Sequence, residues 1–181
     1  MKWLAASDIH GSAHACRKLL EAYDREGAER LILLGDILYH GPRNDLPREY
    51  DPKAVIALLN PRRNDLLCVR GNCDSEVDQM VLEFPILADY ALFCIGNRTV
   101  FATHGHRFNV ANPPPLQTGD ILLHGHTHVP ACEPFGEKNL YCNPGSVAIP
   151  KENTPPSYMI LEPDRFTWKT LDGEPFKTNL L

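Results

Sequence analysis

The sequence of 181 residues contains no apolar run that approaches the ~18 residues of a membrane-spanning helix. The apolar stretch before Asp8 is too short for a signal peptide. An excess of positive charge is also missing, since 18 basic residues stand against 23 acidic ones. Proteins that grip a nucleic-acid backbone need the opposite balance. We therefore expect a cytoplasmic protein with no membrane segment, for which nucleic acid is an unlikely partner.

Closely spaced cysteine pairs are absent as well. The six cysteines are spread from Cys16 to Cys142 without a Cys-x-x-Cys pair. This spacing argues against a structural zinc site built from thiolates and favours reduced thiols. The chain is nevertheless long enough to be stabilised by a hydrophobic core alone. We expect one domain that spans residues 1–181.

Apolar runs and helical patterns alternate in the first half of the chain. Residues 2–6, 31–34 and 66–69 predict buried strands, and helices are expected from about Ser12 and after Asp51. This alternation predicts a parallel sheet covered by helices. The second half instead contains a series of short strand patterns, at residues 91–95, 99–102, 121–123, 129–132, 140–142, 158–161 and 166–171. We expect two packed sheets with helices outside them.

Polar side chains that can bind metals follow several of these strands. Asp8 and His10 are two positions apart, and His126 and His128 repeat the spacing. On an extended strand end, residues i and i+2 point to the same side. Further candidates each neighbour a glycine, which allows a sharp turn of the backbone. These are Asp36, Asn72 and His104.

The number and type of these side chains indicate the kind of site. Two aspartates, one asparagine and four histidines exceed the four ligands of a tetrahedral zinc ion. Mixed nitrogen and oxygen ligands suit two divalent cations that share a bridging carboxylate, with manganese or iron preferred over calcium. Two such cations can clamp the oxygens of a phosphoryl group during in-line displacement.

The order of these motifs resembles the calcineurin-like metallophosphoesterases, and in particular their small YfcE-type phosphodiesterase branch. The similarity extends over most of the chain. Its matching segments are Ala6–Gly11, Leu34–Asp36, His40–Asn44, Arg70–Asp78, Thr103–His106, Gly125–His128 and Asn143–Ser146.

The resemblance implies an α/β fold, a four-layer α/β/β/α sandwich of two mixed sheets flanked by helices. It also implies hydrolysis of small phosphodiesters by a hydroxide that two divalent metals activate. Manganese is the expected metal, with iron, cobalt, nickel and zinc as alternatives. One metal would be held by Asp8, His10, Asp36 and His128. The other would be held by Asp36, Asn72, His104 and His126, so that Asp36 bridges the pair.

One position departs from the wider superfamily. Many members carry a histidine after the Gly-Asn motif that is thought to protonate the leaving oxygen, whereas this chain has Cys73, as does the YfcE-type branch. A neutral thiol is a poor general acid at neutral pH. His40 is our candidate for that role, and a solvated loop histidine is the alternative.

Four further residues are candidates for substrate binding: Arg43, Asn44, Cys73 and Asp74. A guanidinium fork suits phosphate, although Arg43 also fits a solvated loop charge. Asp74 also suits two supporting roles, either orienting a ligand histidine or capping the next helix. Cys73 also fits simple packing beside the metals.

Two other functions remain open from the sequence. The same fold serves as a non-catalytic scaffold subunit in a membrane-coat complex, but such a protein should have gaps in the ligand set. Larger relatives act as nucleases, but no basic stripe or aromatic platform is present here. Oligomeric state is not readable, although exposed apolar strands would allow a homo-oligomer.

Overall fold

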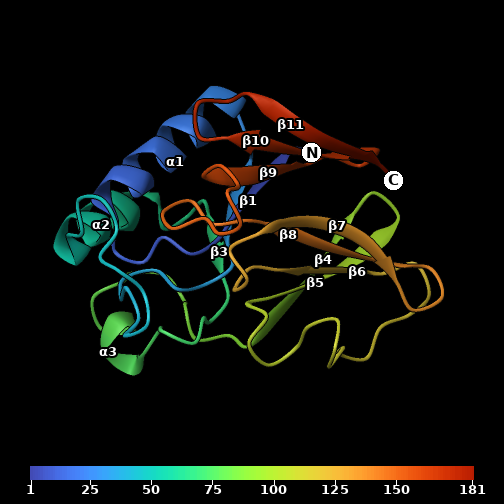
Figure 1. Cartoon of the computed structure of the whole chain (residues 1–181), viewed down its shortest axis with the longest axis horizontal. Coiled ribbons are helices and arrows are strands. Elements are labelled where there is room, and N and C mark those ends of the chain that lie inside the picture. Colours follow the sequence, from blue (N-terminus) through green and yellow to red (C-terminus); the bar gives the residue numbers. More distant parts are fainter.

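The computed structural model describes Met1 to Leu181 and contains two β-sheets stacked face to face (Figure 1). The first sheet has the strand order β11-β10-β9-β1-β2-β3. Its strands are β1 (Trp3–Ala6), β2 (Arg30–Leu33), β3 (Leu66–Cys68), β9 (Ser157–Leu161), β10 (Arg165–Thr170) and β11 (Pro175–Leu180). Strands β1, β2 and β3 are parallel, so their carboxyl ends meet at one edge of the sheet.

Two helices cover the outer face of this sheet, α1 (Ala13–Glu26) and α2 (Pro52–Leu59). Ser12 caps α1 by accepting a hydrogen bond from the Ala15 amide, and Gly27 ends it in the left-handed conformation. Asp51 caps α2 in the same way. Both helices were predicted, and their apolar faces pack on the sheet. A 3₁₀ turn (Asn60–Arg62) and the short α3 (Glu76–Gln79) follow along the chain.

The second sheet has the order β4-β5-β6-β8-β7. Its strands are β4 (Tyr90–Ile95), β5 (Arg98–Thr103), β6 (Ile121–His124), β7 (Pro130–Phe135) and β8 (Asn139–Pro144). Its inner face packs on the first sheet through a buried core that includes Ile32, Leu123 and Trp168. The Trp168 indole donates a hydrogen bond of 2.6 Å to the Asn143 carbonyl, which joins β10 to β8.

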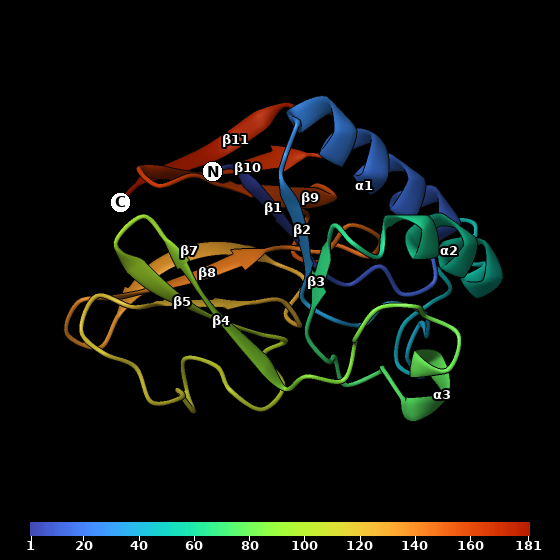
Figure 2. The same ribbon diagram turned by 180° about the vertical axis from the view of Figure 1, so that it is seen from behind.

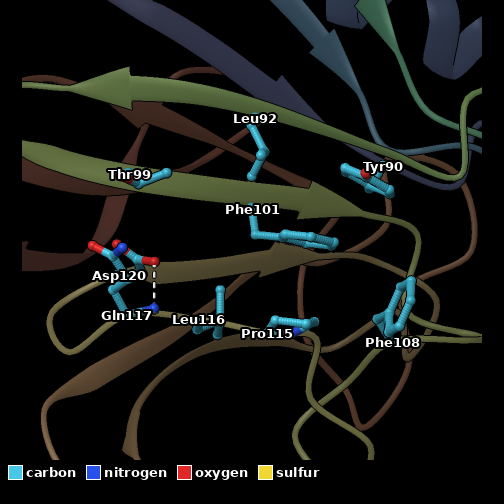
Figure 3. A pocket seen from close by; sticks show the side chains of 9 residues that line it. All are labelled: Tyr90, Leu92, Thr99, Phe101, Phe108, Pro115, Leu116, Gln117 and Asp120. Carbon is cyan, nitrogen blue, oxygen red and sulfur yellow. Dashed lines mark hydrogen bonds between the residues drawn. The ribbon is translucent and has the colours of Figure 1, made fainter.

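The outer face of the second sheet carries no helix. Seen from behind in Figure 2, both α1 and α2 lie against the first sheet. The loop between β5 and β6 lies over the outer face instead and leaves an apolar groove (Figure 3). Phe101 from β5 faces Phe108 and Leu116 from this loop across the groove. The helix expected outside this sheet is thus replaced by irregular chain.

The predicted fold class, an α/β sandwich with two mixed sheets, is confirmed. Strand β11 was not predicted, although Asp172-Gly173 before it is a typical hairpin turn. None of the helices has the length and apolar character needed to cross a bilayer.

Candidate metal centre

Sharp turns at the strand ends carry the predicted metal ligands. Five of the ligands have positive φ angles, namely Asp8 (62°), His10 (49°), Asp36 (57°), His126 (68°) and His128 (64°). The expected extended geometry at Asp8-x-His10 and His126-x-His128 is therefore wrong. The chain leaves each strand through a left-handed turn, and the turn makes the two side chains converge. Left-handed backbone is strained for residues other than glycine and often marks functional sites.

Asp8, His10 and His128 form one group of potential ligands. His10 Nε2 lies 3.6 Å from Asp8 Oδ1, and His128 Nε2 lies 3.3 Å from the same oxygen. All three side chains are buried. The other oxygen of Asp8 accepts a hydrogen bond from the His126 amide, which fixes the carboxylate in orientation.

Asp36 lies between this group and a second one. Its Oδ2 atom is 3.6 Å from His10 Nε2 and 3.4 Å from His104 Nε2. His104 Nε2 in turn lies 3.1 Å from Asn72 Oδ1 and 3.2 Å from His126 Nδ1. The structure thus brings all seven predicted ligands together, with one Asp36 oxygen facing histidines of both groups.

Backbone carbonyls determine which ring nitrogen carries the proton in the neutral form of three of these histidines. The Nδ1 atoms of His10, His104 and His128 lie 2.7–2.8 Å from the carbonyl oxygens of Tyr39, Leu34 and Ile149. A carbonyl only accepts hydrogen bonds, so each Nδ1 is the donor and each neutral ring presents an unprotonated Nε2 to the site.

Acceptor atoms consequently face acceptor atoms across the centre. Asp8 Oδ1 and His10 Nε2 are buried and have no hydrogen-bond partner. The lone pairs of these two atoms face each other across 3.6 Å, which is unfavourable unless a cation lies between them. Asp8 also forms two compact three-residue groups, one with His10 and His128 and the other with Asp36 and His104. The donor set fits divalent cations.

The pKa values of His104 and Asp8 also indicate that the site favours a bound positive charge. Burial opposes protonation of His104, yet its hydrogen bond to Asp36 and the charge of Asp8 raise its pKa to about 9. Burial likewise favours a neutral Asp8, but the adjacent imidazoles of His10 and His128 hold its pKa well below the usual value. A proton on His104 and a bound cation are alternative ways to balance the carboxylates.

Asp74 joins the turn that carries Asp36 to the turn that carries Asn72. Its buried carboxylate accepts hydrogen bonds of 2.7–2.9 Å from the amides of Asp36, Ile37 and Gly71. The turns touch so closely that a Cβ atom on Gly71 would lie 2.1 Å from Asp36 Oδ1. Asp74 does not line the cavity, so the structure gives it a supporting position and no contact with substrate.

The segment 143–146 supports the His126-x-His128 turn. The Asn143 amide group donates hydrogen bonds to the Gly125 carbonyl (2.9 Å) and to Thr127 Oγ1 (3.0 Å). Ser146 Oγ donates a hydrogen bond of 3.0 Å to the Asp8 carbonyl. This turn thus positions predicted ligands from both sheets.

An open cavity of about 470 Å³ lies above the ligands. Three predicted substrate-binding residues, Arg43, Asn44 and Cys73, line it. Burial, reinforced by the Asp36 carboxylate, raises the pKa of Cys73 to about 12, so its thiol is neutral. Two other lining residues, Thr127 and Lys151, were missed in the sequence. Thr127 lies within a recognised motif, whereas nothing local marks Lys151.

His40 is not among the residues that line the cavity. Its ring packs edge-on against Tyr39 and Tyr50, with ring centroids 4.8 and 5.2 Å apart. The structure therefore does not favour His40 as the acid for the leaving group. His124 stacks on Tyr141, and burial lowers its pKa to about 4, which indicates a structural role.

Comparison with known proteins agrees with this geometry. The calcineurin-like phosphoesterase superfamily domain matches residues 1–165. The curated relative Phosphodiesterase YfcE of Escherichia coli (strain K12) is 49% identical over 164 residues, which cover 91% of this chain and 89% of the relative. Probable metallophosphoesterase YsnB of Bacillus subtilis (strain 168) is 26% identical over 168 residues, or 89% of this chain and 83% of the relative.

Among solved structures, YfcE, a phosphoesterase from E. coli, superposes with a TM-score of 0.95 at 45% sequence identity. The superposition covers 99% of both chains. The family match includes every segment that carries a predicted ligand, and the structural superposition extends over nearly the whole chain. The chain belongs to the calcineurin-like phosphoesterase superfamily.

Proposed function

We propose that this protein is a phosphodiesterase that hydrolyses small phosphodiesters with two divalent cations. One cation is held by Asp8, His10, Asp36 and His128. The other is held by Asp36, Asn72, His104 and His126. Manganese suits this mixed nitrogen and oxygen donor set, and iron, cobalt, nickel and zinc are the alternatives.

The facing lone pairs of the buried centre carry this proposal. Asp36 Oδ2 lies 3.4–3.6 Å from imidazole nitrogens that belong to two ligand groups. A single carboxylate oxygen in that position suits a bridge between two cations. The likeness to Phosphodiesterase YfcE supports a phosphodiester as the substrate.

When bound, two cations lower the pKa of a water molecule and neutralise charge on a phosphoryl group. The protein's own residues determine where that chemistry occurs. The carbonyl partners of His10, His104 and His128 hold the proton of each neutral ring on Nδ1, which leaves Nε2 free to bind a cation. Asn72 lies in the cavity wall beside Cys73, where its side-chain amide would help to hold the second cation and would be within reach of a bound phosphate.

No residue in the cavity wall stands out as an acid for the leaving group. The Cys73 thiol is neutral and holds its proton tightly, and His40 lies outside the wall. We infer that the protein prefers diesters whose leaving groups depart without protonation. The six free cysteines suit a reducing compartment, and we propose the cytoplasm as the site of action.

The scaffold alternative receives less support, because the complete donor set has no structural purpose without cations. The nuclease alternative is opposed by the net charge of −5. Comparison of turnover on single-stranded DNA and on a small diester separates that alternative from ours.

Two measurements test the proposal together. Metal analysis of the manganese-loaded protein should give two ions per chain, and a chelator should abolish hydrolysis of bis(p-nitrophenyl) phosphate. Asp36→Asn should reduce both the metal count and turnover, the latter by at least about 100-fold. Wild-type kinetics with two ions bound in this variant would contradict the bridging role.

A further inference from the structure

Two cationic side chains in the cavity wall have no carboxylate partner. Arg43 and Lys151 both line the cavity above the ligands. Neither side chain takes part in an ion pair or a hydrogen bond within the protein. Other cations, such as Arg17 and Lys169, pair with nearby glutamates. The guanidinium and the ammonium in the wall are thus available to a bound molecule.

Hydrogen bonds within the protein hold the backbone near Arg43 and at Lys151. Lys151 donates its amide proton to the His128 carbonyl (3.2 Å) and accepts from the Thr154 hydroxyl (2.7 Å). On the other loop, the Asn44 side chain donates a hydrogen bond of 2.8 Å to the His40 carbonyl. The Arg43 and Lys151 side chains therefore project from fixed turns, which lowers the entropy cost of binding an anion between them.

With two divalent cations bound, the site would carry more positive charge than a simple diester can balance. The centre contains two carboxylates, Asp8 and Asp36, and two divalent cations more than neutralise them. Arg43 and Lys151 increase this positive excess, while a phosphodiester brings a single negative charge. Pro42 and Cys73 are the only weakly polar or apolar side chains of the wall, so the cavity offers little to an uncharged hydrophobic group.

We propose that Arg43 and Lys151 form an anion subsite, and that the substrate is a small phosphodiester with a second anionic group near the scissile phosphate. The inference rests on the function proposed above and narrows its substrate class. The second group is a phosphate or a carboxylate, since both suit a guanidinium fork and an ammonium. The cavity volume of about 470 Å³ favours a small molecule over a polymer.

Matched pairs of chromogenic substrates test this inference. Thymidine 5′-(p-nitrophenyl phosphate) with and without a 3′-phosphate tests phosphate as the second group. The p-nitrophenyl diesters of 4-hydroxybutyrate and of butanol test carboxylate. Within each pair the leaving group is the same, so the ratio of kcat/KM values reports recognition of the second charge. We expect a ratio of about ten in at least one pair.

Variants locate the effect. The ratio should fall toward one in Arg43→Met/Lys151→Met, and Lys151→Glu should lower it further by repulsion. Lys53→Met is the matched control, because Lys53 is an exposed cation on α2 that lies outside the cavity wall. The control should keep the wild-type ratio. Circular dichroism and metal counts of the variants verify that fold and cations are retained.

The outcomes separate this inference from the proposed function. Chelator-sensitive turnover with ratios near one in both pairs overturns the anion subsite and leaves the phosphodiesterase intact. A ratio that survives in the double variant overturns the assignment to Arg43 and Lys151. If oligothymidylate competes more tightly than the 3′-phosphorylated thymidine substrate, the assignment of a small molecule as substrate is overturned. Absence of turnover on every diester defeats both proposals.

Discussion

The Asp74 carboxylate accepts a hydrogen bond of 2.8 Å from the backbone amide of Asp36, which lies 38 positions earlier in the chain. Its other contacts, with the amides of Ile37 and Gly71, make one buried side chain the link between two turns. Asp36 and Asn72 leave those turns toward the same centre. The position of two predicted metal ligands therefore depends on a residue that does not line the cavity.

Replacement of this carboxylate should weaken metal binding. Asp74→Asn substitutes an amide group for one of the acceptor oxygens, so an amide proton in the turns loses its partner. We expect metal affinity to fall about 10- to 100-fold, as for other residues that orient ligands. Competition with a fluorescent chelator measures this change. Asp172→Asn removes an exposed carboxylate, 79% accessible at its side chain, and should have no effect. Equal affinity in Asp74→Asn and wild type would remove the positioning role.

A methyl group at Gly71 should separate the same two turns. The added Cβ would lie 2.1 Å from Asp36 Oδ1 and 2.3 Å from the Asp36 amide nitrogen. Because these atoms belong to a buried turn, the backbone must shift, and we expect Gly71→Ala to lose most activity. Gly27→Ala is the control, since its Cβ would meet nothing within 4 Å and only the end of α1 is strained. That variant should lose about 1 kcal/mol of stability and keep full specific activity. Retained two-metal binding and turnover in Gly71→Ala would contradict the close fit.

An ion-pair network between α1 and the first sheet should make stability depend on pH. Glu26 accepts hydrogen bonds from Lys2, Lys169 and Tyr158, at 2.7–2.9 Å. Burial favours the neutral acid, but these partners lower the pKa of Glu26 to about 2, against 4.5 for an unperturbed glutamate. The folded state thus binds this proton less readily than the unfolded state. The resulting stabilisation is complete above pH 4.5 and disappears as the pH falls toward 2.

Glu26→Gln should therefore lower the free energy of unfolding at pH 7 by about 1–3 kcal/mol. The difference from wild type should shrink steadily as the pH falls below 4.5, which urea titrations at several pH values will show. Glu21→Gln, with a side chain 62% exposed, serves as the control and should differ little at any pH. A difference between Glu26→Gln and wild type that does not change with pH would argue against the network.

Removal of the His40 imidazole tests which group supplies a proton to the leaving oxygen. Since His40 packs between Tyr39 and Tyr50 and does not line the cavity, His40→Ala should disturb the loop without changing the chemistry. We expect the same fractional loss of turnover across a series of diesters whose leaving groups differ in pKa. A loss that grows as the leaving group becomes worse would restore His40 as the acid.

Local sequence patterns predicted the elements that place Asp8, Asp36 and Asn72. Each follows a short apolar run, and parallel strands bring their carboxyl ends to one edge whatever the distance in sequence. The ligand histidines His104, His126 and His128 were visible because they cluster after predicted strands. These signals are local, so they could be read without knowledge of the packing.

Other features depend on contacts that no local pattern records. Lys151 lines the cavity because the turn that contains it bonds to the His128 carbonyl, a tertiary contact. The packing of His40 between two tyrosines likewise arises from how the loop folds back toward Tyr50. The left-handed turns at Asp8 and His10 contradict ordinary residue preferences and are held by hydrogen bonds from their amides to the carbonyls of Gly35 and Asp36. The loop over the second sheet, where a helix was expected, buries Phe101 but leaves Tyr90 and Leu92 exposed.

The hydrogen bond from the Trp168 indole to the Asn143 carbonyl links the predicted metal centre directly to the core between the sheets. Asn143 holds the turn of His126 and His128, while Trp168 lies fully enclosed between the sheets. Damage to the interior, even remote from the cations, is thus transmitted to the ligands, and heat-treated samples should lose catalytic power and native shape at the same temperature.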